Sequence, residues 1–375
     1  MGRRRWLTGA LLAAGVAVSA CTPPGPPPPP LWGTTRVART ANALERIERV
    51  GAWTDDAWFA TVDARTDLVN GGMTASLRVF PRTGANGAGL GAPQVVALPG
   101  LPSGSFSPLV GEHVVGVQVG DTVHFLRPTG GVWGLAGSVT LSPGQRLLDL
   151  TDEWMVVGPG PTGAALVKVY AVDVSGPQVS VTSNSILAPD PSWSGGLQAG
   201  FGRAAKVDGD LLAVRASSEV ESDAGGVRLN RVIGGGWQPV QTLLRSGPGV
   251  FFGGSFDVDD GPSIDRLVVR SVVNGPGTVE VWADAGAGFQ LAQVLQPDAT
   301  DPDLSNGAEF GWGLSAPGYF EEGEVRTFQA PLGSGVLSSQ APFLQVSGNL
   351  VAAGVFVNFD GTPWWGFEAW SIDRN

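Results

Sequence analysis

Residues 252–271 read FGGSFDVDDGPSIDRLVVRS, and residues 201–217 read FGRAAKVDGDLLAVRAS. Both stretches begin with Phe-Gly, pass through a turn of aspartate and glycine, and end in an apolar run. Asp-Gly between two short apolar runs indicates a turn between two β-strands, because glycine accepts the backbone angles that tight turns need. The later stretch has four more residues before its apolar run, and its aspartates lie there. We therefore predict the same strand-turn-strand unit in both places.

A four-residue pattern extends this similarity to the whole chain. An apolar residue is followed by a polar or charged one, then usually by an apolar and an aromatic residue. The pattern occurs seven times, with 42 to 60 residues between the last positions of successive copies. The copies are Leu77–Phe80, Val123–Leu126, Val167–Tyr170, Val227–Asn230, Val279–Trp282, Val325–Phe328 and Phe367–Trp370. Units of about 40 to 50 residues with several short strands are typical of the blades of β-propellers.

The flanks of the copies repeat as well. A more apolar run precedes most copies, as in 211–214 and 267–273, and predicts an inner strand buried on both faces. After several copies, a glycine turn leads into an aromatic residue and a further strand, as at Trp133, Trp237 and Phe289. The fold predicted from the sequence is therefore all-β: a seven-bladed β-propeller with four antiparallel strands per blade, forming a single domain over 31–375.

The two ends of the chain supply a check on this fold. Only five residues follow Trp370, so the last blade lacks its outermost strand. The segment 31–43 resembles that strand, and we expect it to complete the last blade and so remove two sheet edges. One segment, 41–50, has apolar residues spaced by three, which favours a helix. In the sixth blade, 310–324 is short for two strands, so we expect irregularity there.

The Phe-Gly openings resemble the FG-GAP repeat of integrin-alpha-type seven-bladed propellers and their bacterial relatives. The pair opens three blades, at Phe201, Phe252 and Phe310. The Gly-Ala-Pro that usually follows the second strand in this family is absent. The resemblance therefore covers about a third of the chain well, and the rest only through its period.

This resemblance implies a possible calcium loop in the fifth blade. In the family, some blades carry D-x-D/N-x-D/N-G-x-x-D between the first two strands, and Asp257, Asp259 and Asp265 match its positions one, three and nine. Calcium prefers several oxygen ligands that are close in sequence. Positions five and six depart from the pattern, being Gly261 and Pro262. The alternative is a solvated acidic turn.

The N-terminus predicts an export signal and a lipid anchor. Three arginines precede an apolar run at 6–20, which is short for a membrane span and typical of a signal peptide. The run ends in Val-Ser-Ala-Cys21, which resembles the lipobox of bacterial lipoproteins, where the cysteine is lipidated. Residues 1–20 are thus interpreted as the signal peptide and 21–30, rich in proline, as a semi-rigid tether. We expect an extracytoplasmic protein anchored to the cell membrane, exported by the general or the twin-arginine route.

The charge of the chain limits its partners. The net charge is −11, and removing residues 1–20 with their three arginines would leave −14. An acidic body argues against nucleic-acid binding. A single cysteine excludes an intramolecular disulfide, so the fold depends on its core. We expect a monomer whose partners are the membrane, through its anchor, and an unidentified extracellular protein or glycan.

Few residues indicate chemistry. The two histidines begin an inner strand (His113) and fill the polar position of a repeat copy (His124), where we expect a surface side chain. One cysteine and two histidines argue against a zinc site of the usual ligand sets. No catalytic residue is assigned. The adjacent Trp364 and Trp365, expected before the last strand with rings on opposite faces, are a candidate binding surface.

These observations favour a non-catalytic binding or interaction module on a lipid anchor. Two alternatives remain open: a propeller enzyme, hydrolase or lyase, acting on extracellular polysaccharide, and a structural component of the cell envelope. Two or more carboxylates meeting a histidine or arginine in one pocket would favour the enzyme.

Overall fold

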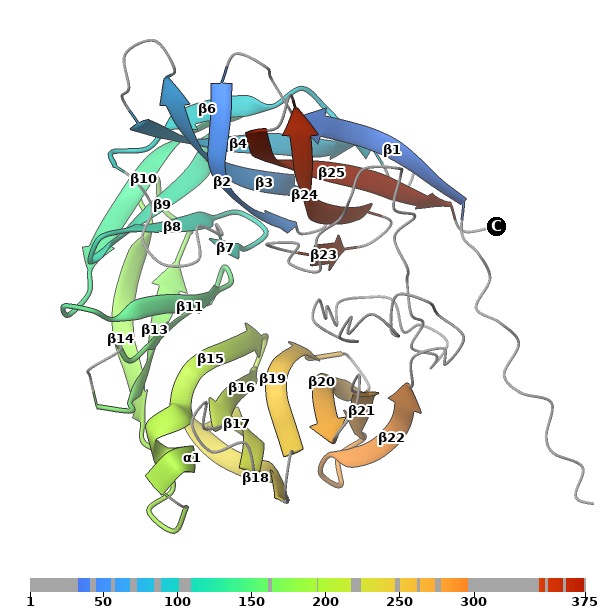
Figure 1. The fold of residues 1–375 in the computed structure, drawn as a ribbon. Helices are drawn as coiled ribbons and strands as arrows, with labels where there is room; N and C mark the ends of the chain where they lie inside the picture. Colours follow the sequence, from blue (N-terminus) through green and yellow to red (C-terminus); the bar gives the residue numbers. More distant parts are fainter. Residues whose placement is uncertain are drawn as a thin grey trace, which may run out of the picture. The chain divides into compact units, whose positions relative to one another are not determined.

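A computed structural model gives the fold of the chain (Figure 1). It describes residues 33–40, 45–54, 58–67, 73–83, 89–100, 109–160, 164–193, 195–216, 224–246, 250–261, 264–273, 278–295, 344–347, 350–359 and 362–373. All of them belong to one compact unit, Trp32–Asn375. The described elements are strands apart from one short helix, α1 (Gly195–Gly200), so the predicted all-β class is confirmed.

The described strands form six antiparallel sheets, which follow one another along the chain. Sheet 1 contains β2 (Glu45–Thr54), β3 (Trp58–Asp67), β4 (Met73–Thr83) and β5 (Gly89–Leu90), with β6 (Gln94–Ala97) also paired to β4. Sheet 2 contains β7 (Leu109–Val110), β8 (Val115–Val119), β9 (Thr122–Thr129) and β10 (Val132–Thr140). Sheet 3 contains β11 (Arg146–Leu150), β12 (Trp154–Gly158), β13 (Val167–Asp173) and β14 (Ser180–Leu187).

The remaining sheets have the same order. Sheet 4 contains β15 (Phe201–Asp208), β16 (Leu211–Ala216), β17 (Ala224–Ile233) and β18 (Gly236–Ser246). Sheet 5 contains β19 (Val250–Asp259), β20 (Asp265–Val273), β21 (Thr278–Asp284) and β22 (Gln290–Leu295). The terminal sheet contains β23 (Leu344–Ser347), β24 (Leu350–Phe359), β25 (Thr362–Asp373) and β1 (Gly33–Thr40). Four-stranded antiparallel sheets are therefore confirmed, and the expected sixth blade falls mainly in 296–343, outside the described residues.

The repeat pattern occupies the same place in every described sheet. Six of its seven copies lie on the third strand of their sheets, β4, β9, β13, β17, β21 and β25, and the apolar runs before them form the second strands. Second strands such as β12 and β16 are almost entirely buried, as the sequence predicted for an inner strand. The aromatic residues after the glycine turns open the outermost strands. In the described sheets, the short repeat thus marks the third strand.

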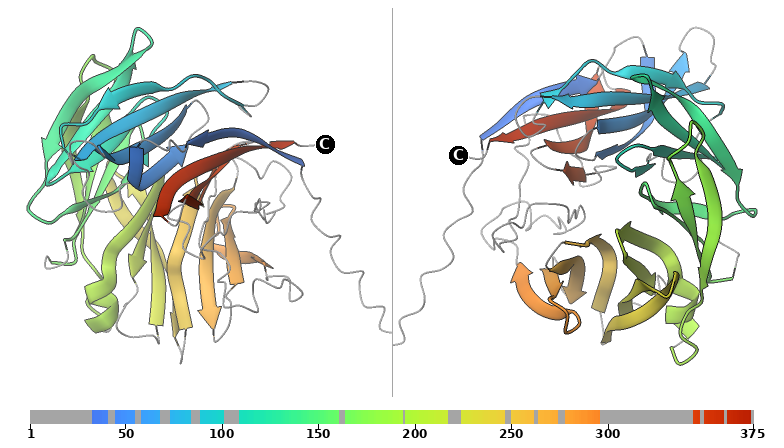
Figure 2. Two further views of the ribbon diagram at one scale, coloured as in Figure 1. Left: turned by 45° about the horizontal axis from the view of Figure 1, so that its top comes forward. Right: turned by 180° about the vertical axis from the view of Figure 1, so that it is seen from behind.

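The first strand of the chain completes the last sheet. β1 pairs along its length with β25, and Figures 1 and 2 show the two strands side by side in each view. This pairing was predicted from the missing outermost strand, and it is confirmed.

The helix favoured at 41–50 is wrong for its described part, because Glu45–Thr54 is strand β2. A bulge explains the misleading pattern. β2 carries one extra residue between Ile47 and Arg49, so Ile47 and Val50 pair with Arg65 and Asp63, only two positions apart. A spacing of three, which favours a helix in sequence, therefore fits a strand with a bulge.

Neighbouring sheets bury their faces against each other. Four apolar cores are described, and each draws its side chains from two sheets that are consecutive in the chain. The core between sheets 4 and 5 contains Leu229 from one side and Phe252, Phe256 and Phe289 from the other. In each of these four cores, one sheet covers the face of the other without a helix layer between them.

The Phe-Gly pair makes the same irregularity in sheets 4 and 5. After Phe201 and after Phe252, four residues of the first strand lie opposite two residues of the second strand. Both phenylalanines are fully buried. Gly202 and Gly253 follow them with φ of 78° and 80°, in the left-handed region that favours glycine.

These two glycines also touch the preceding sheet. A Cβ on Gly202 would lie 2.5 Å from Cγ2 of Val167, and one on Gly253 would lie 3.0 Å from Cγ2 of Val227. Val167 and Val227 are the first residues of the repeat copies in sheets 3 and 4. The Phe-Gly opening of one sheet is therefore fitted to the repeat copy of the sheet before it.

Polar side chains add a second link between the outermost strands. Three such hydrogen bonds are described. In each, a side chain on the outermost strand of one sheet accepts a hydrogen bond from a backbone N–H of the next sheet. The donor is the aromatic residue at the start of that sheet's outermost strand. The pairs are Gln94 and Trp133 (2.9 Å), Ser185 and Trp237 (3.0 Å), and Gln241 and Phe289 (2.8 Å). The three aromatic residues are buried, and Trp133 and Trp237 each contact another tryptophan edge-on.

The contact between the Phe-Gly glycine and the preceding sheet can be tested with Gly202→Ala. We expect the free energy of unfolding to fall by roughly 2–5 kcal/mol, because left-handed strain and overpacking against Val167 add. Gly234→Ala is the matched control, since Gly234 has φ of 64° but no neighbouring atom within 4 Å of an added Cβ. The control should lose only the strain, about 1–2 kcal/mol. Equal losses in urea denaturation would contradict the proposed inter-sheet fit.

Candidate functional site

The acidic stretch of sheet 5 lies where the sequence placed it, between the first and second strands. Asp257 and Asp259 belong to β19, where they pair with Val268 and Arg266, and Asp265 begins β20. The three residues proposed for calcium therefore come from the ends of two paired strands.

Two of these carboxylates form ion pairs with arginines. Oδ2 of Asp259 lies 3.4 Å from Nη1 of Arg266, and Asp265 forms an ion pair with Arg231. Arg231 also lies 3.5 Å from Oδ1 of Asp260. A cation in this turn would have to compete with two guanidinium groups, and the calcium assignment stays a prediction.

Asp260 links sheet 5 to the turn between β15 and β16 in sheet 4. Its Oδ2 accepts the N–H of Asp210 at 2.7 Å, and its own N–H donates to Oδ2 of Asp208 at 2.9 Å. A Cβ on Gly209 would lie 2.3 Å from that Oδ2, so the carboxylate reaches the turn only over a glycine. The added residues of the fifth unit thus dock on its shorter copy, a role that the sequence did not reveal.

Burial brings these carboxyls into an unfavourable electrostatic setting. Burial raises the pKa of Asp208, and the neighbouring Asp260 charge adds to the effect. Burial and the Asp208 charge also raise the pKa of Asp259. Positive charge close to this junction of sheets 4 and 5 would therefore be stabilising.

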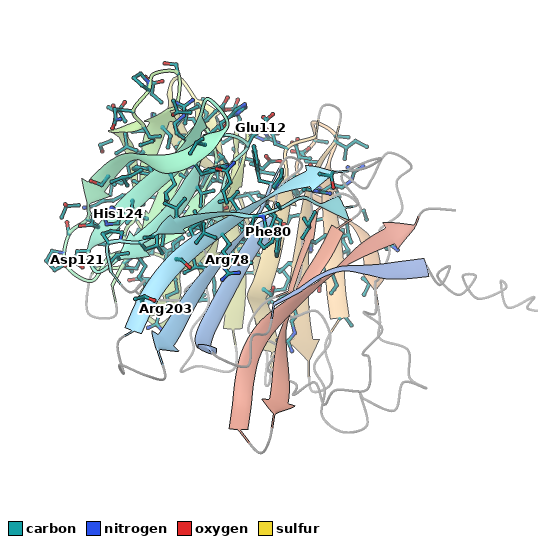
Figure 3. The ribbon with its side chains drawn as sticks, turned by 90° about the horizontal axis from the view of Figure 1, so that it is seen from above. Arg78, Phe80, Glu112, Asp121, His124 and Arg203 are labelled. Carbon is teal, nitrogen blue, oxygen red and sulfur yellow. The ribbon has the colours of Figure 1, made fainter. Side chains whose placement is uncertain are left out.

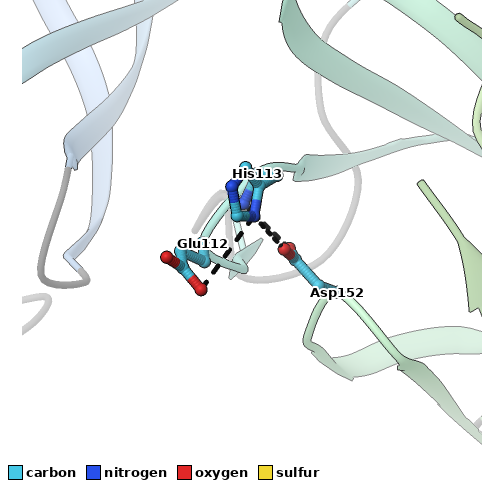
Figure 4. A group of neighbouring side chains, drawn as sticks. All are labelled: Glu112, His113 and Asp152. Atoms are coloured by element: carbon cyan, nitrogen blue, oxygen red, sulfur yellow. Dashed lines mark hydrogen bonds and ion pairs between the residues drawn. The ribbon is translucent and has the colours of Figure 1, made fainter. Parts of the chain in front are cut away.

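A second group of titratable side chains joins sheets 2 and 3 (Figure 4). Nδ1 of His113 lies 2.5 Å from Oδ2 of Asp152 and 4.0 Å from Oε2 of Glu112. The backbone N–H of His113 donates to Oδ1 of Asp152 at 2.8 Å. Glu112 and His113 lie in the turn between β7 and β8, and Asp152 lies in the turn between β11 and β12. The sequence analysis missed this group because its members are 39 residues apart.

The two junctions share one geometry. In each, a carboxylate from the first turn of a sheet accepts an N–H from the first turn of the preceding sheet. In each, a glycine makes room: a Cβ on Gly111 would lie 2.6 Å from Oδ1 of Asp152, as one on Gly209 would meet Asp260. Both junctions combine a glycine in the first turn of one repeat unit with an aspartate in the first turn of the next unit. This combination is the sequence signal that could have predicted them.

A buried carboxylate joins sheets 3 and 4. Asp149 is 4% exposed, and its Oδ2 accepts the N–H of Val207 at 2.8 Å. Its Oδ1 lies 3.7 Å from Nζ of Lys206. Burial raises the pKa of Asp149, while Lys206 opposes that rise.

The second residue of the repeat copy reaches toward the end of the preceding sheet. Arg228 donates to the carbonyl of Ala188 at 2.6 Å and stacks on Phe201, and burial lowers its pKa to about 10. Glu280 forms an ion pair with Arg245 at 3.0 Å. In sheets 4 and 5, this position therefore contributes to the contact with the preceding sheet.

His124 occupies the same position in sheet 2, and Figure 3 labels it together with Arg78, its counterpart on β4. It is half-buried and therefore partly exposed, so the expected surface position stays a prediction. It borders a hollow of about 310 Å³ that is lined also by Val96, Ala97, Leu98, Pro99, Leu126 and Leu135. Burial lowers the pKa of His124, and its buried Nδ1 has no hydrogen-bond partner among the described residues.

The side chains of the other predicted site residues are not among those that the structure describes. Trp364 and Trp365 lie within β25 and pair with Val357 and Phe356, rather than on a loop before the strand. Their role in binding stays a prediction. Cys21 and the segments 1–20 and 21–30 lie outside the described residues. Among the described residues, no helix has the length and apolar character needed to cross a membrane.

Comparisons with known proteins give only distant structural likenesses. No protein-family model matches the chain, and no curated protein matches it in sequence. Similar solved structures include the β-propeller domain of the Trilobed protease from Pyrococcus furiosus, at 8% identity and a TM-score of 0.40, covering 86% of this chain and 83% of that one. The WD40 domain of SCAP from fission yeast has 12% identity and a TM-score of 0.39, with 91% and 87% covered.

An enzyme is also among the similar structures. The catalytic domain of a GH62 α-L-arabinofuranosidase from Coprinopsis cinerea has 9% identity and a TM-score of 0.31, with 90% and 96% covered. Likeness at these levels of identity and TM-score assigns no function, and it does not distinguish a binding module from an enzyme.

The electrostatic cost at the junction of sheets 4 and 5 predicts a pH dependence that Asp208→Asn should remove. Because folding raises the pKa of Asp208, the stability linked to this group is full below its unfolded pKa and is lost as pH rises through its folded pKa. Asparagine keeps the oxygen that accepts the Asp260 N–H. The melting temperature of the variant, relative to the wild type, should therefore rise as the pH increases above about 4, the ordinary pKa of an aspartate.

Asp173→Asn provides a control of opposite sign for this measurement. Hydrogen bonds from the side chain and backbone of Ser175 lower the pKa of Asp173, so its contribution is present at high pH and lost on acidification. The relative melting temperature of this variant should fall as pH rises. The same trend in both variants would contradict the assignment of the Asp208 effect to buried charge.

Proposed function

We propose that this chain is a membrane-anchored extracytoplasmic lipoprotein whose body is a closed seven-bladed β-propeller that serves as a binding module. The observation that carries the proposal is the pairing of β1 with β25. The strand that follows the proline-rich tether in the sequence completes the last sheet as its outermost strand, which is how a ring of blades closes and removes two sheet edges. The same strand thus connects the anchor segment to the body.

The seven-bladed form is supported by the sheets together with the repeat. Six copies of the repeat lie on the third strands of six described sheets, and the seventh copy, Val325–Phe328, would supply the remaining blade. The relationship to FG-GAP propellers is supported by the identical bulges at Phe201 and Phe252.

A binding role is supported by the positions of the buried charged side chains, which in the described sheets bond to other parts of the scaffold. Asp149, Arg228 and Glu280 each bond to a neighbouring sheet or to the end of one. These groups hold the scaffold together, so recognition falls to exposed turns and outer strands. The partner would be an extracellular protein or glycan, and the pair Trp364 and Trp365 is a candidate part of the contact surface.

A second candidate function is a propeller enzyme that cleaves extracellular polysaccharide. The observation that favours it is the meeting of His113 with two carboxylates, Glu112 and Asp152. His113 is 57% exposed and Glu112 75% exposed, so this group lies on surface turns. Hydrolysis or elimination needs an acid and a base held around the substrate, for which an open turn is poorly suited.

The proposed function is tested in the native host with wild type and Cys21→Ala. We expect the wild type to incorporate a fatty-acid label and to remain with the membrane fraction, and the variant to do neither. Isolated from the membrane after crosslinking, the wild type should retain a defined protein or glycan, with no soluble sugar released from envelope polysaccharide. Labelling of the Cys21→Ala variant would contradict the anchor, and sugar release lost in Glu112→Gln would favour the enzyme.

We also propose a structural calcium ion held by Asp257, Asp259 and Asp265. The raised pKa of Asp259 supports a cation at this turn, while the arginine pairs of Asp259 and Asp265 oppose it. Calcium chelation should lower the melting temperature of the wild type by several degrees, since a ligand bound only to the folded state stabilises it. Asp257→Ala should remove this shift and Asp173→Asn should keep it. Melting curves that are unchanged by chelation would exclude the ion.

A further inference from the structure

Three side chains from two turns of different sheets have their ligand atoms close together. Glu112 and His113 come from the turn of sheet 2, and Asp152 comes from the turn of sheet 3. One nitrogen or oxygen atom from each lies within 4.8 Å of the others (Figure 4). The group is separate from the acidic turn of sheet 5, which contains no histidine.

The chemistry of the group differs from that of a calcium site. Calcium takes oxygen ligands alone, whereas one imidazole nitrogen with two carboxylate oxygens is a donor set that zinc accepts. Zinc sites with three protein ligands leave a fourth position for water. The exposure of His113 and Glu112 keeps that position open to solvent.

The carboxylate of Asp152 is already oriented for such a role. Its Oδ1 accepts the backbone N–H of His113, which turns its Oδ2 toward the imidazole. A side chain at position 111 would push this carboxylate away, because a Cβ there would lie 2.6 Å from Oδ1. A hydrogen bond to the oxygen that does not bind the ion is the usual way in which metal ligands are held in place.

The distances around His113 allow an ion after small movements. Ligand atoms around a tetrahedral zinc ion lie roughly 3.4 Å apart, given metal–ligand distances near 2.1 Å. The separations of 2.5 Å and 4.0 Å from Nδ1 lie on either side of this value. His113 and Glu112 are exposed enough to adjust by the rotation of their side chains.

We propose that Glu112, His113 and Asp152 form a binding site for a divalent transition-metal ion, with zinc as the best match, at the junction of sheets 2 and 3. The sequence argued against zinc only for the usual sets rich in cysteine and histidine. This site uses one histidine and two carboxylates, brought together by the contact between sheets. An ion bound there would add a second link between two turns that the Asp152 carboxylate already joins.

The test is calorimetric titration with zinc of the full chain carrying Cys21→Ser, purified without a polyhistidine tag. Removing the lone thiol leaves no cysteine that could bind the ion. We expect one zinc ion per chain, and about tenfold or greater loss of affinity in His113→Ala. His124→Ala is the matched control, since it removes the only other histidine and should leave the affinity unchanged.

Asp152→Asn separates a ligand from a structural side chain. Asparagine keeps an oxygen for the His113 N–H but loses the charge, so we expect weakened zinc binding with an unchanged melting temperature in chelator. Cobalt gives a second readout, because its visible absorption should appear in the parent chain and vanish in His113→Ala. Absence of zinc binding by the parent chain, or equal binding by His113→Ala, would overturn the proposal.

Discussion

The fold depends on the burial of each sheet against the next. A four-stranded sheet with a second strand as apolar as β12 or β16 has two faces to remove from water, and no helix layer covers them in the part of the chain that the structure describes. The described cores therefore lie between consecutive sheets, and each needs both of its neighbours to be folded. Apolar burial has no direction of its own, so the Phe-Gly bulge and the glutamine and serine hydrogen bonds between outermost strands set the register in which two sheets meet.

Buried and half-buried carboxylates also lie at the junctions between sheets. Asp149, Asp152 and Asp260 each carry a carboxylate across a junction to a backbone N–H of another sheet. A carboxylate at a junction costs solvation, and further polar groups gather to offset the cost. Where those groups are arginines, as around Asp260, the result is mainly structural. Around Asp152 these groups are a histidine and a second carboxylate, and together with Asp152 they provide the ligands of the proposed metal site.

The sequence revealed strand order well and contacts between sheets poorly, for physical reasons. The repeat predicted third strands from Leu77–Phe80 to Phe367–Trp370 because alternation along a strand is a local property. The site at His113 depends on Asp152, and the role of Asp260 depends on Gly209; these partners belong to other repeat units and leave no local pattern. The hollow beside His124 is lined partly by residues 96–99, which belong to another repeat unit, so no local pattern predicts it. Ile47 and Val50 misled because a bulge changes the spacing of a strand.

The pairing of β1 with β25 also orders events in time. β1 is the first described strand to leave the ribosome, yet its partner strand, β25, is the last described strand to be made. Closing a loop of nearly the whole chain costs conformational entropy, and contacts so distant in sequence form slowly. The earlier sheets can fold on their predecessors as they emerge, while β1 waits unpaired. The final step of folding therefore falls after synthesis of the C-terminus, when the first and last strands meet and the terminal sheet receives its fourth strand.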